Sequence, residues 1–208
     1  MNVDINYIIL RFVILAPPFL FALTFHELAH GYVALRMGDP TAKNAGRLTM
    51  NPLKHLDPLG VLAFVLIRIG WAKPVPVNPI YFRDPQKGML FVSLAGPGSN
   101  IVLAVFSAII YKFMVSLSGV PQYIAFPLTE MFRASVWINV MLAVFNFLPI
   151  PPLDGSKILM ALLPRKAAAT YARYEAYGFV IVLLLFVTGV ISKIIFPIIL
   201  FFTSLLIT

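Results

Sequence analysis

The amino-acid sequence is dominated by apolar runs that are each about as long as a membrane is thick. The first, residues 8–25, is 18 residues long and is interrupted only by Arg11 and the pair Pro17-Pro18. A helix needs about 20 apolar residues to cross the hydrocarbon core of a bilayer. Only 12% of the residues are charged, against about 25% in a typical soluble domain. The sequence therefore indicates a multi-pass integral membrane protein. Comparable runs cover residues 88–115, 131–148 and 177–208.

These runs predict an all-α polytopic membrane protein with about 4 to 6 transmembrane or re-entrant helices. The paired prolines predict a kink or a short irregular turn in the first span. The run at residues 59–69 has only 11 residues, so we interpret it as re-entrant or interfacial. Residues 177–208 form either a tight hairpin or one kinked, tilted helix. We expect residues 1–208 to form a single membrane-embedded domain without a separate soluble domain.

A proline-punctuated segment, Lys73 to Pro79, follows the short run. Each residue before a proline is pushed toward β or polyproline geometry. The segment therefore predicts a short extended or β element, which the neighbouring basic residues Arg83 and Lys87 place near the cytoplasmic face. An extended backbone can pair with an exposed strand of a bound chain, with Val75 and Val77 as the side chains expected at that contact.

The net charge of +8 comes from Lys and Arg in short loops between the spans. Such placement is typical of the cytoplasmic side of a membrane protein and does not call for a nucleic-acid partner. The loop at residues 116–130 has no Lys or Arg, so we expect it outside. We expect the plasma membrane as the location, and no cleaved signal peptide, because Met1 to Tyr7 has no basic leader. The chain has no cysteine, which excludes thiolate metal sites.

The end of the first apolar run carries the segment Phe25-His26-Glu27-Leu28-Ala29-His30. Residues i and i+4 share one face of a helix, so His26 and His30 can both face one metal ion. Imidazoles bind zinc well, and Glu27 beside them can take a proton from a water molecule at the metal. Alternatively, the two histidines are core residues bonded to backbone carbonyls. The spacing favours a metal site.

A zinc site with two His ligands needs a further protein ligand, and Asp154 is the strongest candidate. It follows the span at residues 131–148 in the irregular stretch Asn146 to Gly155, which contains three prolines. Loop charges bring the ends of this span and the first span to the same face. Asp154 could instead cap the following helix. The remaining carboxylates are expected to be solvated or salt-bridged: Asp4, Asp39, Asp57, Asp84, Glu130 and Glu175.

The HELAH segment, Ala95-Gly96-Pro97 and the Asn146 to Gly155 stretch together resemble the site-2 protease family of intramembrane zinc metalloproteases. The resemblance implies a metalloprotease domain of the short form, without accessory domains, that contains Zn²⁺. It implies His26, His30 and Asp154 as zinc ligands and Glu27 as general base and acid. Asn146 would hydrogen-bond the substrate backbone or the oxyanion. The implied partners are a transmembrane protein substrate and the lipid bilayer, and the oligomeric state stays open.

Three alternatives remain open at this point. A membrane metal-ion transporter could use the same His, Glu and Asp cluster, and a non-catalytic relative could bind membrane helices without cutting them. His55 could be a fourth ligand or a transition-state donor, although a structural role is favoured because its neighbours form a loop. A heme site is disfavoured because His26 and His30 face the same side.

Overall fold

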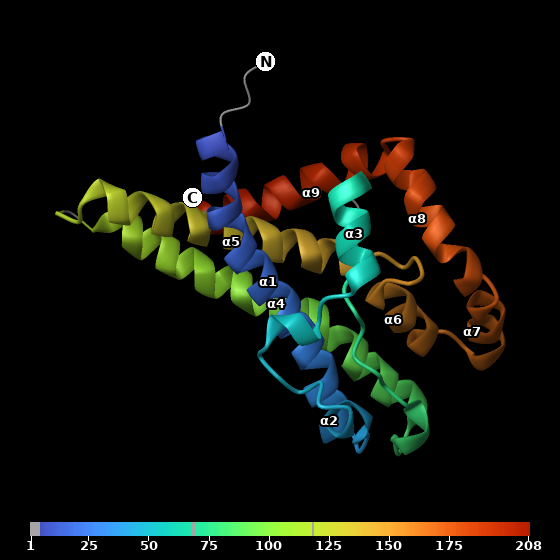
Figure 1. Ribbon diagram of the computed structural model, residues 1–208. Coiled ribbons are helices and arrows are strands. Elements are labelled where there is room, and N and C mark those ends of the chain that lie inside the picture. The colour runs from blue at the N-terminus through green and yellow to red at the C-terminus, as the bar shows by residue number, and fades with distance from the viewer. Residues whose placement is uncertain (1–4, 68–69, 118) are drawn as a thin grey trace.

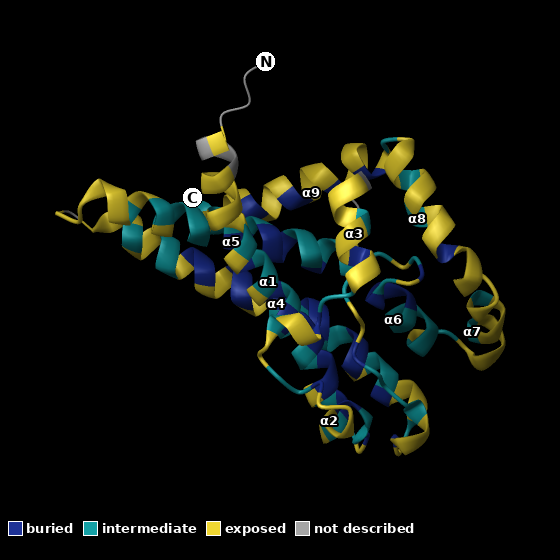
Figure 2. Ribbon diagram, in the orientation of Figure 1, coloured by how far each residue is buried: buried dark blue, intermediate teal, exposed yellow. Residues whose placement is uncertain are grey.

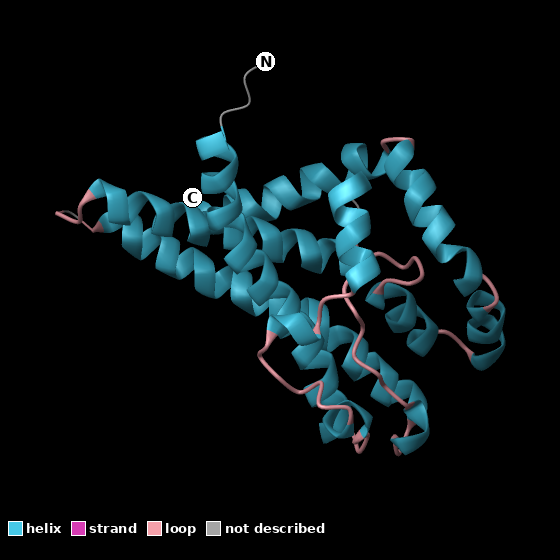
Figure 3. Ribbon diagram, in the orientation of Figure 1, coloured by secondary structure: helices cyan, strands magenta, loops and turns pink. Residues whose placement is uncertain are grey.

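The computed structural model describes residues 5–67, 70–117 and 119–208, and most of these residues are helical (Figures 1 and 3). Residues 1–4, part of the stretch on which the signal-peptide expectation depends, and Arg68 and Ile69, the end of the short apolar run, lie outside the described residues. The elements are α1 (Ile5–Arg36), α2 (Thr41–Asn44), η1 (Pro52–Lys54), α3 (Pro58–Ile67), η2 (Pro79–Tyr81), α4 (Pro85–Ser116), α5 (Gln122–Asn146), α6 (Asp154–Leu162), α7 (Arg165–Ala172), η3 (Glu175–Tyr177), α8 (Gly178–Val187) and α9 (Val190–Ile207).

Among the described residues, five helical stretches are long and apolar enough to cross a membrane, which agrees with the predicted number of spans. They lie in α1, α4, α5, the combined stretch from α7 to α8, and α9. The C-terminal region is therefore two helices and not one. The chain turns between them at Gly189, which has a φ of +73° that glycine adopts without steric cost. From this turn α8 and α9 diverge (Figure 1).

Two sequence predictions about the helices need correction. Helix α1 continues through Pro17 and Pro18, which excludes the irregular turn that was predicted there as the alternative to a kink. Helix α5 begins at Gln122 and includes Pro127, so most of the predicted outside loop at residues 116–130 is helical. A helix in lipid satisfies its own backbone groups, and this requirement extends the helix beyond the run of strongest hydropathy.

The part of the chain that the structure describes contains no strand, so the short extended or β element expected near the site is not found. Leu56 and Ala72 form one isolated antiparallel bridge, and residues 73–78 belong to no helix or strand. Pro74 and Pro76 have no backbone N–H, so this segment cannot form a regular ladder of its own. The β character expected there is therefore reduced to the single bridge.

Helix α4 is the centre of the fold, because it packs against α1, α5, α6 and α9. Buried residues concentrate where these helices cross, and the outer helix faces are exposed and largely apolar, as expected for contact with lipid (Figure 2). Small side chains let the helices approach closely. The core of α4, α5 and α9 consists of Ala104, Ala108, Val136, Val140, Ile191, Ile195 and Ile199. This packing brings the end of α1 against the first half of α4 and the start of α6.

Candidate active site

The two histidines of the HELAH segment lie one turn apart on α1, inside the described span and not in a loop. Both are buried, with 6% of His26 and 8% of His30 exposed. Their Nε2 atoms are 3.0 Å apart. The i and i+4 spacing therefore brings the two imidazoles together at a single point, as predicted.

Asp154 completes this cluster from a distant part of the sequence. Its Oδ2 atom lies 3.1 Å from the Nε2 atom of both His26 and His30. Asp154 is the first residue of α6, and the N-cap position before it is Leu153. The prediction that these two segments converge is confirmed.

The residue after Asp154 explains how α6 can start so close to α5. A Cβ atom added at Gly155 would lie 2.4 Å from the carbonyl oxygens of Phe147 and Leu148. No side chain fits at that distance, so glycine is required for the short connection between the two helices. The Leu-Asp-Gly sequence therefore positions Asp154 through its glycine.

The three ligand atoms fit a zinc ion. Their separations are 3.0, 3.1 and 3.1 Å. Ligands bonded to zinc at 2.0–2.1 Å in a tetrahedral site are about 3.3 Å apart. Two imidazoles and one carboxylate are also a common catalytic donor set, which leaves a fourth position for water or substrate. This buried trio is the only such group of metal-binding side chains among the described residues.

The outer nitrogen of each imidazole has a hydrogen-bond partner on α4. His30 Nδ1 donates to the backbone carbonyl of Val92 at 2.7 Å, since a carbonyl oxygen can only accept. This bond leaves the Nε2 lone pair of His30 free to bind a metal. His26 Nδ1 lies 2.6 Å from Oδ1 of Asn100.

Gly96 provides the space that the two imidazoles occupy. A Cβ atom at this position would lie 2.4 Å from His30 Nε2 and 2.6 Å from His26 Cε1. At Gly96, therefore, the groups that approach the backbone of α4 most closely are the imidazole rings. A Cβ atom added at Gly98, two residues later, would meet no such neighbour within 4 Å.

Glu27 is buried beside the cluster, and its side chain contacts residues 73–78, which are called the extended segment below. Its Oε2 atom accepts a hydrogen bond of 2.8 Å from the backbone N–H of Val75. Val75 itself is buried, and its Cγ1 atom lies close to Gly31 on the next turn of α1. Val77 packs further along, against the cluster of Ala34, Phe82 and Val92. The extended segment therefore follows the end of α1, with Glu27 between it and the histidines.

Two charged residues hold this segment at its ends, and the sequence reasoning missed both. Arg47 donates to the carbonyls of Lys73 and Pro74, at 2.7 and 3.2 Å. Asp39 accepts from the backbone N–H of Asn78 at 2.6 Å and from the N–H and hydroxyl of Thr41. Asp39 is fully buried, so the expected solvated or salt-bridged role is wrong for this residue. No signal in the sequence pairs these side chains with their backbone partners.

Asn146 and His55 both donate a hydrogen bond to a backbone carbonyl close to them in the sequence. Asn146 is the last residue of α5, and its Nδ2 atom donates to the carbonyl of Leu142 at 3.0 Å. His55 is fully buried in the loop after α2, where its Nε2 atom donates to the carbonyl of Thr49 at 2.9 Å. His55 is absent from the group of metal-binding side chains among the described residues.

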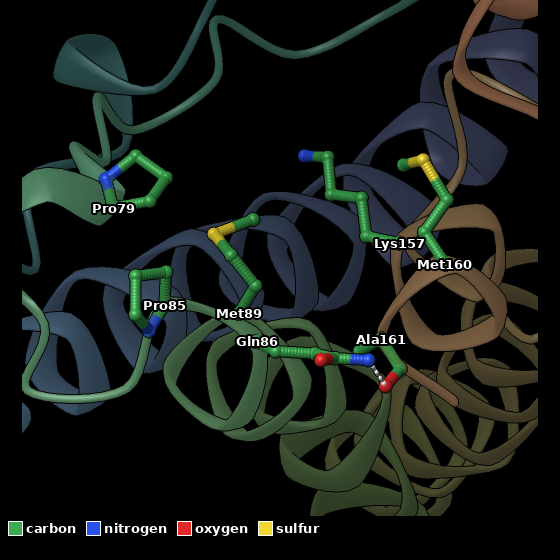
Figure 4. Close-up of a pocket in the computed structure, with 7 residues that line it drawn as sticks. All are labelled: Pro79, Pro85, Gln86, Met89, Lys157, Met160 and Ala161. Carbon is green, nitrogen blue, oxygen red and sulfur yellow. Dashed lines mark hydrogen bonds between the residues drawn. The ribbon is translucent and has the colours of Figure 1, made fainter. Parts of the chain in front are cut away.

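An open hollow lies between the start of α4 and α6 (Figure 4). Lys157 and Met160 extend from α6 on one side, and Pro79 and Met89 lie on the other. Gln86 connects the two sides, because its Nε2 atom donates to the carbonyl of Ala161 at 2.6 Å. The hollow therefore lies next to the end of the extended segment and is lined on one side by α6, the helix that begins with Asp154.

Comparison with known proteins agrees with this arrangement. The model of peptidase family M50 matches residues 14–189. A protein of Bacillus subtilis named "Putative zinc metalloprotease YwhC" is 43% identical over 178 residues, which are 85% of this chain and 81% of that protein. Rip2 of Mycolicibacterium smegmatis, described in the same words, is 30% identical over 203 residues, 92% of this chain and 73% of that protein. No solved structure matches the chain significantly. Since the matched residues include both histidines, Glu27 and Asp154, the chain belongs to peptidase family M50, the site-2 protease family.

Proposed function

We propose that this protein is a zinc-dependent metalloendopeptidase of the HExxH type that hydrolyses a peptide bond within or near a transmembrane segment of a membrane protein. The observation that carries the proposal is the buried trio of His26 Nε2, His30 Nε2 and Asp154 Oδ2, with Glu27 adjacent in the sequence and buried beside it. Burial of an ionisable cluster at the end of a spanning helix costs free energy, so such a cluster indicates a functional site.

The roles follow from the chemistry of the groups. His26, His30 and Asp154 would hold the zinc ion through one atom each. A zinc ion held there lowers the pKa of a water molecule and polarises the carbonyl of the bond to be cut. Glu27 would accept the proton of that water and pass it to the leaving amine. Because Glu27 Oε2 already accepts from Val75, we assign the proton transfer to its other oxygen.

Substrate binding would use the extended segment. A transmembrane helix has its carbonyls in hydrogen bonds, so it must unwind locally before it can be cut. An unwound segment could then add to the backbone of residues 75–79, with Val75 and Val77 at the contact and Asn146 bonding the substrate backbone or the oxyanion. Unchanged cleavage after replacement of residues 75–79 by a Gly-Ser segment would eliminate this step.

We further propose that residues 1–208 act as one membrane-embedded domain in the plasma membrane, with the active site toward the cytoplasm. The supporting observation is that most Lys and Arg residues lie either between the end of α1 and the start of α4 or between α5 and α8. The expected partners are the bilayer and a transmembrane substrate, with no nucleic acid.

The test of this function uses purified protein in detergent and a single-span substrate. We expect cleavage that stops when a chelator removes the metal and returns when zinc is added. The same protein in proteoliposomes should give no zinc flux. Flux without cleavage would instead support the transporter, and zinc-loaded protein that binds the substrate without cutting it would support a non-catalytic relative.

A further inference from the structure

A buried chain of polar side chains extends from the candidate metal cluster into the bundle. His26 Nδ1 lies 2.6 Å from Asn100 Oδ1, and Asn100 Nδ2 donates to Asn139 Oδ1 at 2.9 Å. Asn139 in turn donates to Ser135. Asn100 is 0% exposed and Asn139 is 1% exposed. Two buried amides between spanning helices are expensive unless they have partners, so their arrangement calls for an explanation.

The orientation of both amides follows from backbone carbonyls, which can only accept hydrogen bonds. Asn139 lies 2.9 Å from the carbonyl oxygen of Ser135, so the group facing that oxygen must be its NH₂. Its Oδ1 atom then faces Asn100, which must present its own NH₂ in return. The carbonyl of Ala22, 3.3 Å from Asn100 Nδ2, requires the same orientation independently. Asn100 therefore has only its oxygen to offer His26.

The oxygen of Asn100 determines which nitrogen of His26 carries the proton. An amide oxygen accepts, so Nδ1 of His26 is the N–H donor, and Nε2 has the free lone pair. Nε2 is the atom that lies 3.1 Å from Asp154. His30 reaches the same state through the carbonyl of Val92. A backbone carbonyl therefore fixes the tautomer of His30, and the side chain of Asn100 fixes the tautomer of His26.

We propose that Asn100, oriented by the backbone carbonyl of Ala22, is a positioning residue that fixes His26 in the tautomer and ring orientation required for metal binding. This inference depends on the proposed metal site. Partners of this kind on metal-binding histidines affect metal affinity by about 10- to 100-fold. The prediction concerns zinc affinity, which can be measured separately from cleavage.

Three variants of the purified full chain separate positioning from structural support. Asn100→Leu removes the acceptor for His26. Asn100→Asp keeps an acceptor but places an oxygen against Asn139 Oδ1. Asn139→Leu is the matched control, because it removes a buried amide one bond further from His26 and leaves the Ala22 carbonyl to orient Asn100. Asn100→Ala replaces Asn100→Leu if the larger side chain prevents folding.

Zinc affinity is measured by competition with a chelator, and the melting temperature is measured in excess chelator. We expect about 10- to 100-fold weaker zinc binding for Asn100→Leu. Asn100→Asp should bind zinc within about threefold of wild type although its metal-free form melts earlier, because a carboxylate also accepts from a metal-binding histidine. Asn139→Leu should lower the melting temperature with little change in zinc affinity. The absorption spectrum of the cobalt-loaded protein should change for Asn100→Leu alone.

Two outcomes would overturn the inference. One is wild-type zinc affinity in Asn100→Leu or Asn100→Ala, and the other is an equal loss of affinity in Asn139→Leu. If Asn100→Asp binds zinc as weakly as Asn100→Leu, the acceptor is not the relevant feature, and the inference also fails. Absence of zinc binding by the wild-type protein would instead refute the proposed function.

Discussion

The contact between Gly96 and the two imidazoles gives a prediction in which metal binding and helix stability change independently. Substitution of Gly96 by alanine places a Cβ atom 2.4 Å from His30 Nε2, 2.5 Å from His30 Cε1 and 2.6 Å from His26 Cε1. The ring of His30 cannot move freely away from Gly96, because its Nδ1 atom donates a hydrogen bond to the carbonyl of Val92, which lies on α4 like Gly96. The ligand side chains must therefore move, or α4 must shift away from α1.

The size of the effect follows from the required movement. An ordinary contact at 3.4 Å needs a displacement of about 1 Å, whereas zinc–nitrogen bonds of about 2.0–2.1 Å tolerate a deviation of about 0.2 Å. Partners outside the ligand set already change affinity by about 10- to 100-fold. We therefore expect zinc binding by Gly96→Ala to weaken by at least about 100-fold, which is about 2.8 kcal/mol. Alanine favours a helix by up to about 1 kcal/mol over glycine, so α4 itself should not unfold.

The matched control is Gly98→Ala, two residues further along α4. It has the same change in helix propensity, but its added methyl group meets no atom within 4 Å. The assay measures the zinc content of each purified variant after dialysis against a series of zinc buffers, followed by cleavage of a single-span substrate. Gly98→Ala should match wild type in both measurements. Wild-type zinc affinity in Gly96→Ala would refute the geometric reasoning.

Three further predictions concern the surrounding polar contacts. Burial opposes ionisation of Asp39, but hydrogen bonds from Thr41 and Asn78 hold its pKa below the usual value. The contribution of ionised Asp39 to the free energy of unfolding is therefore complete above about pH 4. It disappears as the pH falls through the folded-state pKa. Thermal melting should show Asp39→Asn to be less stable by about 1–3 kcal/mol at pH 7, and a gap that did not narrow below pH 4 would contradict this. Arg47→Lys loses a bond to the carbonyls of Lys73 or Pro74, so kcat/KM should fall by up to about tenfold at unchanged zinc content; lost zinc would mean a wider disturbance. His55→Ala should cost about 2 kcal/mol of stability and retain zinc, whereas zinc loss would make His55 a ligand.

Much of the site could be predicted from the sequence because its chemistry depends on local patterns. The histidine spacing is a property of one helix turn, and the structure brings both rings together. Asp154 could be found because it is an ionisable residue directly after a span, in a stretch where prolines prevent regular helix. The loop charges were sufficient to predict that the end of the first span and the segment with Asp154 lie at the same face.

The supporting contacts could not be predicted, because their partners are distant in the sequence and are backbone groups. Asp39 and Arg47 looked like ordinary loop charges, yet both are buried against residues 73–78. Asn100 belongs to no sequence pattern of its own, and its partners come from α1 and α5. A buried hydrogen bond of this type leaves no periodic signal.

The early start of α5 illustrates a different limit. Residues 116–130 lie between two apolar runs and were expected to form a loop, but α5 begins at Gln122 and includes Pro127. Charge distribution therefore does not predict where a helix begins or ends.

The most direct test of the central claim is the zinc-loaded Glu27→Gln variant. Glutamine has nearly the same shape but cannot accept the proton from water, and Glu27 is not among the three proposed ligands. Zinc content and cleavage of a single-span substrate are measured on the same purified sample, beside wild type. We expect one zinc per chain and no cleavage from Glu27→Gln. Cleavage at the wild-type rate by this zinc-loaded variant would contradict the mechanism.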